Sequence, residues 1–384
     1  MKILHLSDLH IGKNVNGFSM LDEQKHIFRQ IIGHIRAEGP DAVIIAGDIY
    51  DRTNPGGEAI HVFDDFLTEL SQEDAAVMII SGNHDSPEKI NYASRLLTDK
   101  RIYFYGAFDD SMRRVALRDD YGEAVFWLLP FIRPAAVRGI FENIELDSYD
   151  DVVSAALETA NIDYSSRNVL ISHQFYTKAG IIPVRSESEL NPVGGLDAVD
   201  AGLLEKFDYI ALGHLHGAQR VGSEHIRYCG SPLKYSFSEW HQEKSATLAE
   251  IGGKGEITLK ALPLVPIHDM REIKGELDML MSEGISSLAD NEDYLRVILT
   301  DEEEIIDPMG KLRSVYPNIM SLDFENSRTS VDLAAVTTDA QDVERLSAYE
   351  LFGEFFLDMQ GSVMSEEQSE IVRDLLETER TGEE

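Results

Sequence analysis

The sequence predicts an α/β fold with a largely parallel sheet, because short β-branched runs alternate with amphipathic helical segments along its first half. Asp22 to Arg36 and Glu58 to Leu70 carry apolar residues at helical spacing between successive runs. Each run stops at a cluster of Asp, Asn, His or Gly, and ligands of such sheets bind beyond the carboxyl ends of the strands. The expected strands are Ile3 to Leu6, Ala42 to Ala46, Ala76 to Ser81, Val169 to Ser172 and Tyr209 to Leu212.

The middle of the chain predicts a hairpin and then a smaller domain. Ala246 to Ile251 and Ile257 to Leu262 are β-like and flank a glycine-rich joint, which is typical of a hairpin that closes a domain. The pattern changes near Pro266. A strand-like segment, Tyr294 to Leu299, then lies between two helical ones, so we expect a small α+β domain. The helical segments are Leu277 to Met281 and Met309 to Val315.

Two helices are expected at the end of the chain, around Tyr349 to Met359 and around Glu366 to Glu379. The second begins with Ser365 and Gln368 at the spacing of a capping box. A stretch rich in Ser, Thr, Asp and Ala precedes them, which is typical of a linker. The expected segments are a catalytic domain at 1–265, a small α+β domain at 266–325, a linker at 326–345 and a helical segment at 346–384.

The composition is that of a globular protein, with 43% hydrophobic and 27% charged residues among 384. We expect a cytoplasmic protein, because no signal sequence or membrane span is visible and Cys229 is the only cysteine. The formal net charge of −35 argues against a DNA partner, since lysine and arginine normally neutralise phosphates. Bound divalent cations would reverse the local sign, and a second protein could supply most of the grip on DNA.

The polar clusters carry the residue types of a metal centre. Asp8 and His10 form one pair two residues apart, and His214 and His216 form another. In an extended chain such residues point to the same side, so each pair can present two ligands to one ion. Carboxylate, imidazole and amide ligands without thiolate suit Mn²⁺, Fe²⁺ or Zn²⁺. The other strand ends add Asp48 and Asp51, then Asn83, His84 and Asp85, and finally His173.

A bridging carboxylate can hold two ions about 3.5–4 Å apart, the spacing that clamps both oxygens of a phosphoryl transfer. We expect Asp48 to be this bridge. A single Asp-x-His pair is common by chance, but five strand ends that each deliver a suitable residue predict a two-metal site. The remaining histidines lack ligand-like neighbours and are interpreted as structural or surface residues. They are His5, His26, His34, His61, His225, His241 and His268.

Taken together, these motifs resemble those of the calcineurin-like metallophosphoesterases, whose fold is a β-sandwich flanked by helices. Tyr228 to Glu239 (YCGSPLKYSFSE), the small domain and the final helices are similar to the SbcD family, so the resemblance covers nearly the whole chain. It implies an Mn²⁺-dependent double-strand exonuclease and single-strand endonuclease. It also implies a small domain that caps DNA, and a final segment that binds the coiled coil of an SbcC-type ATPase in a heterotetramer with two copies of each protein.

The resemblance also implies roles for individual residues. One ion would be held by Asp8, His10, Asp48 and His216, and the other by Asp48, Asn83, His173 and His214. His84 would face the scissile phosphate and stabilise or protonate the leaving oxygen while hydroxide attacks in line. Asp51 or Asp85 would orient its ring, with a slight preference for Asp51. Arg52 directly follows the Asp48 motif and is a candidate phosphate contact.

Two other functions compete with this interpretation. The catalytic core would equally serve a phosphatase or a phosphodiesterase of small substrates, although such an enzyme has no evident need of the extra domain and terminal helices. A metal-free scaffold that only recruits partners would show a broken ligand set. Every expected ligand position is filled here, which favours an enzyme.

Overall fold

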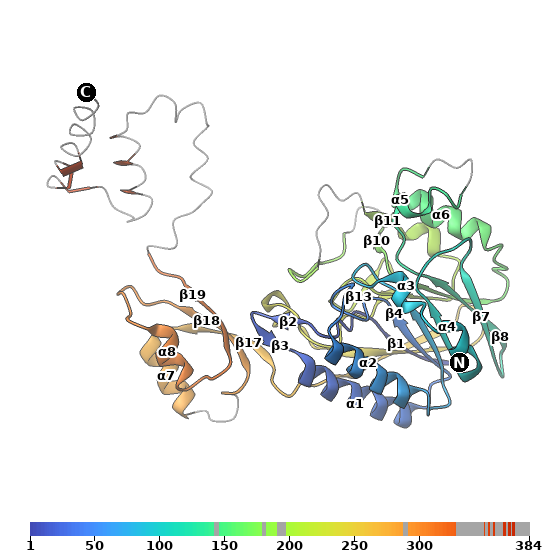
Figure 1. Ribbon diagram of the computed structural model, residues 1–384, viewed down its shortest axis with the longest axis horizontal. Coiled ribbons are helices and arrows are strands. Elements are labelled where there is room, and N and C mark those ends of the chain that lie inside the picture. The colour runs from blue at the N-terminus through green and yellow to red at the C-terminus, as the bar shows by residue number, and fades with distance from the viewer. Residues whose placement is uncertain are drawn as a thin grey trace. The chain divides into compact units, whose positions relative to one another are not determined.

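The computed structural model describes residues 1–141, 146–178, 182–189, 197–286 and 291–327, and isolated positions from 349 to 372. The chain forms two compact units, Met1–Met270 and Arg271–Glu384. They are called unit 1 and unit 2 below (Figure 1). Among the described residues, no helix has the length and apolarity needed to cross a membrane.

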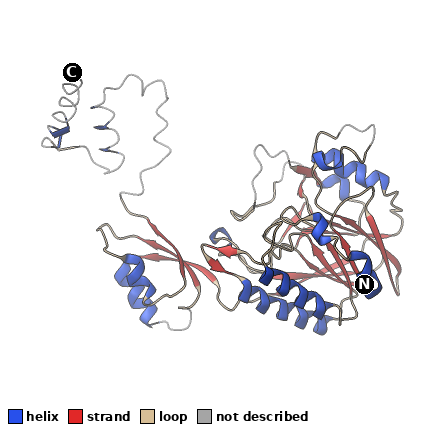
Figure 2. Cartoon of the chain, in the orientation of Figure 1, coloured by secondary structure: helices blue, strands red, loops and turns tan. Residues whose placement is uncertain are grey.

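Unit 1 contains two six-stranded sheets with helices on their outer sides (Figure 2). The first sheet has the order β16-β15-β1-β4-β5-β6, and β1, β4, β5 and β6 run parallel. Its strands are β1 Lys2–Leu6, β4 Ala42–Ala46, β5 Ala76–Ile80, β6 Ile102–Tyr105, β15 Ser245–Ile251 and β16 Ile257–Pro263. The second has the order β13-β14-β12-β9-β8-β7. Its strands are β7 Arg113–Asp119, β8 Gly122–Leu129, β9 Arg167–Ser172, β12 Tyr209–Leu212, β13 Gln219–Val221 and β14 Ser223–Tyr228.

The sheets pack face to face around a shared apolar core, to which Ile3 and Ile44 contribute from one sheet and Phe126 and Ile171 from the other. Alternate residues point to opposite faces of a strand, so every second residue of β4 turns toward the helices instead. Those helices are α1, Leu21–Glu38, and α2, Gly57–Leu70, which are joined by the stacked rings of Phe28 and Phe66 at 4.4 Å.

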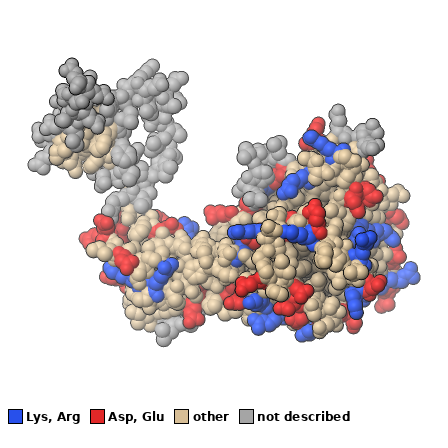
Figure 3. All heavy atoms as spheres, viewed as in Figure 1, with Lys and Arg blue, Asp and Glu red and all other residues tan. Residues whose placement is uncertain are grey.

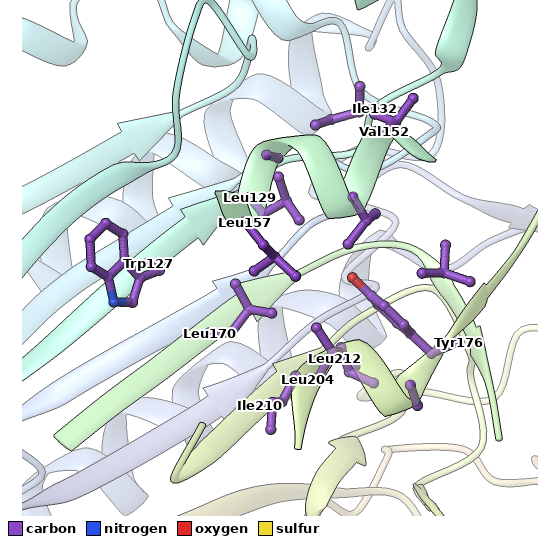
Figure 4. Close-up of a cluster of buried hydrophobic side chains, with 14 of the residues drawn as sticks. Trp127, Leu129, Ile132, Val152, Leu157, Leu170, Tyr176, Leu204, Ile210 and Leu212 are labelled. Atoms are coloured by element: carbon purple, nitrogen blue, oxygen red, sulfur yellow. The ribbon is translucent and has the colours of Figure 1, made fainter. Parts of the chain in front are cut away.

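The outer face of the second sheet carries its own apolar cluster (Figure 4). Leu170 and Leu212 of the sheet pack there with Leu157 of α6, Tyr149–Thr159, and with Leu204 of the 3-10 helix η3, Ala201–Leu204. Ser148 caps α6 in a capping box with Asp151. Both faces of both sheets are therefore covered, which explains why the strands are apolar runs rather than alternating ones.

The alternating pattern predicted one largely parallel sheet, and in this respect the prediction was wrong. β1, β4 and β5 belong to the first sheet, whereas β9 and β12 belong to the second. A strand buried on both faces reads the same in either sheet, so the periodicity could not assign it. The β-sandwich implied by the family resemblance is confirmed. The expected hairpin is also confirmed, because β15 and β16 pair antiparallel.

Unit 2 begins with a three-stranded sheet of order β17-β18-β19 and two helices. Leu295 and Val297 of β18 pack with Leu280 of α7 and Leu312 of α8. The bounds are β17 Met270–Gly275, α7 Leu277–Ser286, β18 Tyr294–Leu299, α8 Pro308–Arg313 and β19 Ile319–Phe324. The expected strand between two helices is confirmed.

The end of the chain is described only in part. The expected linker lies outside the described residues apart from Asn326 and Ser327, and so does most of the two terminal helices. The expected capping box is confirmed, since Ser365 Oγ accepts from the Gln368 N–H at 3.3 Å and Gln368 Oε1 accepts from the Ser365 N–H at 2.9 Å.

Replacing Asp119 with asparagine is expected to destabilise unit 1 by about 2 kcal/mol, since its carboxylate receives two charged hydrogen bonds. Both come from the buried guanidinium of Arg167, at 3.0 and 2.5 Å. These bonds hold the pKa of Asp119 well below its usual range. The stability they provide is therefore full above the ordinary aspartate pKa, near about 3.9, and is lost as pH falls through the lower folded value.

Urea unfolding of the wild type and of Asp119→Asn between neutral pH and pH 3 measures this difference. The exposed pair of Arg114 and Glu123, at 2.7 Å, supplies the control, and Glu123→Gln is expected to cost less than about 1 kcal/mol. A gap between Asp119→Asn and the wild type that stays constant down to the lowest pH would contradict the ion-pair explanation.

Candidate metal centre

The expected ligands converge at the carboxyl ends of strands from both sheets. Four of them have a positive φ, which L-residues rarely adopt: Asp8 at 52°, His10 at 42°, Asp48 at 50° and His214 at 111°. Such conformations cost of order 1–3 kcal/mol each and cluster at functional sites. The extended geometry expected for the Asp-x-His and His-x-His pairs was wrong, because the backbone turns sharply where each strand ends.

One group of side chains forms around His10 and His216, whose Nε2 atoms face each other at 3.0 Å. Asp8 belongs to the same group, with ligand atoms of all three residues within 4.8 Å of one another. Both carboxylate oxygens of Asp8 also accept the main-chain N–H of His214 at 3.1 Å. We call Asp8, His10 and His216 the first cluster.

A second cluster consists of Asn83, His173 and His214. Asn83 Oδ1 lies 3.1 Å from His173 Nε2 and 2.9 Å from His214 Nδ1. His214 and His216 therefore point to different clusters, although the two-residue spacing had suggested that both could serve one ion. The chain turns at His214, so the two rings diverge.

Asp48 lies between the two clusters and is 2% exposed. Its Oδ2 atom is 3.7 Å from His10 Nε2 and 3.3 Å from His173 Nε2, so one oxygen faces a histidine of each cluster. Burial acts to raise the pKa of Asp48, but the neighbouring imidazoles, His173 foremost, outweigh burial and hold this pKa well below its ordinary value. The group therefore stays anionic, as a bridging ligand must be.

These donors fit two divalent cations. Imidazole nitrogens bind such ions at about 2.0–2.1 Å, so two ligands of one ion lie roughly 3 Å apart. The separations between facing nitrogens and oxygens within the clusters, 2.9 to 3.1 Å, match this value. The donors are carboxylate, imidazole and amide, while the thiol of Cys229 contacts Ser7 Oγ instead, at 3.0 Å.

Two glycines allow the clusters to close. Gly47 precedes Asp48 with a φ of 89°, and a Cβ there would overlap the His173 ring. A Cβ at Gly82 would overlap the Asp48 carboxylate. Any side chain at either position would push Asp48 and His173 apart.

His84 lies at the edge of the first cluster, with its ring perpendicular to that of His10 at 4.8 Å. Its main-chain N–H donates to Asp48 Oδ1 at 2.8 Å, and its Nδ1 lies 2.9 Å from the main-chain oxygen of Asp51. Because that oxygen only accepts, Nδ1 carries the proton. His84 also lies within 4.8 Å of His10 and Asp48 in a third possible ligand group.

The carboxylates expected to orient His84 make other contacts. Asp51 binds Lys13 Nζ at 2.8 Å, and Asp85 accepts main-chain N–H groups of Ile49, Tyr50 and Gly82 at 2.9 to 3.1 Å. The ring of His84 is thus oriented by the main chain of Asp51 rather than by either carboxylate. Burial, reinforced by the charge of Asp48, raises the pKa of Asp85 to about 6. Arg52 is 76% exposed and lies 3.6 Å from the Asp51 carboxylate.

Several residues around the centre were not identified from the sequence. Glu239 is fully buried and lies 3.2 Å from His216 Nδ1, and Ser188 Oγ lies 2.7 Å from the same nitrogen. Beside the second cluster, the Arg133 guanidinium covers the Phe131 ring at 5.0 Å, and that ring stands edge-on to His173 at 6.3 Å. Glu239 ends the YCGSPLKYSFSE segment, which was the available signal. Ser188 and Arg133 have no comparable motif.

The comparisons with known proteins agree with this geometry. The calcineurin-like phosphoesterase family matches residues 1–218, and the family described as "Type 5 capsule protein repressor C-terminal domain" matches residues 266–360. Among solved structures, a dimetal phosphatase from Danio rerio gives a TM-score of 0.43 at 14% identity, covering 69% of this chain and 97% of that one.

Curated relatives align over almost the full length. The SbcD component of the nuclease SbcCD from Staphylococcus epidermidis is 31% identical over 98% of both chains. The protein of the same name from Staphylococcus saprophyticus is 29% identical over 98% of both chains. The phosphoesterase family covers more than half of the chain, and the relatives cover nearly all of it. The chain therefore belongs to the calcineurin-like phosphoesterases and, within them, to the SbcD family.

Proposed function

We propose that the chain is a DNA nuclease that uses two divalent metal ions, most favourably Mn²⁺, with Fe²⁺ and Zn²⁺ as alternatives. The observation that carries the proposal is Asp48, whose single oxygen faces both ligand clusters. Asp8, His10, Asp48 and His216 would hold one ion, and Asp48, Asn83, His173 and His214 the other. When bound, the ions would supply a nucleophilic oxygen at neutral pH and neutralise charge on the phosphate.

The chain's own residues position the substrate and the departing group. His84 carries its Nδ1 proton toward the Asp51 main chain, which leaves Nε2 as the ring atom that can take and deliver a proton to a leaving sugar oxygen. Lys13 neutralises Asp51 beside it. Arg52 and Arg133 are proposed phosphate contacts. Figure 3 shows that Lys and Arg side chains are interspersed with Asp and Glu over the visible face of unit 1, despite the net charge.

The test is cleavage of linear duplex and single-stranded DNA by the purified full chain, with Mn²⁺, with the alternative ions and with a chelator. Mn²⁺-dependent cleavage that the chelator abolishes is expected. A small phosphodiester and a phosphomonoester distinguish the alternative function. Hydrolysis of these small substrates, without DNA cleavage in the presence or absence of an SbcC-type ATPase, would show that the enzyme serves a small substrate.

The rest of the chain is proposed to guide DNA and to bind the partner. Unit 2 follows the nuclease unit directly, and we propose that its α+β part, up to residue 325, caps the DNA. The terminal segment at 346–384 is proposed to bind the coiled coil of an SbcC-type ATPase, with two copies of each protein assembling in the cytoplasm. Supporting this, Leu357 and Ile371 are 42% and 60% exposed, and exposed apolar side chains are typical of protein interfaces.

A chain truncated after Asp342 is expected to keep Mn²⁺-dependent hydrolysis of a small phosphodiester, because the proposed ligands all lie in unit 1. It should fail to bind the ATPase, since the apolar helical stripes are removed. Co-purification with the SbcC-type protein measures binding, and the full chain is the control. Undiminished co-purification of the truncated chain would place the binding surface elsewhere.

A further inference from the structure

The ring of His216 is held by a buried charged network that the proposed mechanism does not use. Ser188 Oγ donates to Glu239 Oε1 at 2.6 Å, so the serine oxygen is left to accept from His216 Nδ1 at 2.7 Å. Glu239 Oε1 itself lies 3.2 Å from that nitrogen. Because both neighbours accept, the proton resides on Nδ1 and the lone pair of Nε2 faces His10.

Lys244 supplies the opposite charge. Its Nζ atom is 2.7 Å from Glu239 Oε2, and the two side chains are 5% and 0% exposed. The same ammonium donates to the main-chain oxygen of His216 at 2.9 Å and to Ser231 Oγ at 2.9 Å. The pair therefore holds the ring of His216 and its backbone together, and the buried carboxylate keeps its negative charge.

The other histidines of the two clusters are held differently. His173 Nδ1 lies 2.7 Å from a neutral acceptor, the main-chain oxygen of Ala46. His10 Nδ1 and His214 Nε2 have no hydrogen-bond partner among the described residues. A carboxylate behind an imidazole fixes its orientation and raises its basicity more than a neutral carbonyl does. The two clusters are thus unequal in the support that their imidazoles receive.

We propose that Glu239, counter-charged by Lys244, is a positioning residue that sets the affinity of the ion at the first cluster and leaves the second cluster unaffected. It acts by holding His216 as the tautomer whose Nε2 is free to coordinate. The proposal rests on the proposed function, since it takes His216 to be a ligand. Removal of such a supporting partner lowers metal affinity by about 10- to 100-fold.

Calorimetric titration of the metal-free full chain with Mn²⁺ tests the proposal. For Glu239→Gln we expect one of two binding events to weaken by about 10- to 100-fold and the other to stay unchanged. Asp208→Asn is the matched control, because Asp208 is a buried carboxylate of the same unit that pairs with Lys254 at 2.7 Å. It is expected to lower the melting temperature without changing either binding event.

The double variant Glu239→Gln, Lys244→Met separates positioning from folding. It removes the buried ammonium that Glu239→Gln alone leaves without its counter-charge, so the melting temperature of the metal-free chain should recover toward the wild type. We expect the weak binding event to stay weak. Recovery of the affinity together with the stability would show that the pair only supports the fold, and would overturn the proposal.

The wild-type titration separates this inference from the proposed function. If the wild type binds no Mn²⁺, the two-metal function fails and the inference fails with it. If the wild type binds two ions and Glu239→Gln binds both with unchanged affinity, or loses both equally, only the role of Glu239 is refuted.

Discussion

The Asp48→Asn substitution is expected to abolish DNA cleavage, with a loss of at least ~1,000-fold, or about 4 kcal/mol of transition-state stabilisation. Asp48 Oδ2 faces His10 in one cluster and His173 in the other, so it is the one carboxylate oxygen among the described residues placed to serve both ions. Asparagine keeps the shape and still accepts the His84 N–H at Oδ1, but it removes the negative charge. The fold should therefore persist while both ions are bound less tightly.

The measurement combines metal content, cleavage rate and melting temperature of the metal-free chain. Asp41→Asn provides the control, because Asp41 directly precedes β4 and accepts the Lys2 N–H at 2.8 Å, at the opposite end of the strand from Asp48. It should retain both ions and normal cleavage. Near-normal cleavage by Asp48→Asn at saturating Mn²⁺ would refute the bridging role.

The His84→Ala variant is expected to keep both ions yet lose turnover by about 100- to 10,000-fold, the usual contribution of a positioned acid or base. The reason is its position: its main chain is fixed on Asp48 and its Nδ1 on the Asp51 main chain, so Nε2 is the ring atom left for the substrate. Equilibrium dialysis with Mn²⁺ and single-turnover cleavage measure the two properties separately.

The geometry also offers a competing role for His84, since it lies with His10 and Asp48 in a possible ligand group. A loss of one bound ion in His84→Ala would assign it to coordination instead of catalysis. His61→Ala supplies the control, because His61 is an exposed residue of α2. This variant should match the wild type in both metal content and rate.

The local sequence determined the elements and the chemical character of the centre. Apolar runs such as Ala42 to Ala46 became strands because their residues are buried on both faces, and helical spacing placed α1 and α2. The polar residues after the runs supplied carboxylate, imidazole and amide groups without thiolate, which limits the ions that fit. The Ser365 and Gln368 capping box formed as expected because it involves only contacts between residues close in the chain.

Only the tertiary structure decided how these pieces combine. It divided the strands between two sheets, turned His214 and His216 toward different clusters and gave the His84 ring a main-chain acceptor in place of a carboxylate. It also brought Glu239 and Lys244 behind His216. The physical reason is that periodicity and spacing report which face of an element is buried, whereas positive φ angles at strand ends and contacts between distant segments depend on the packed whole.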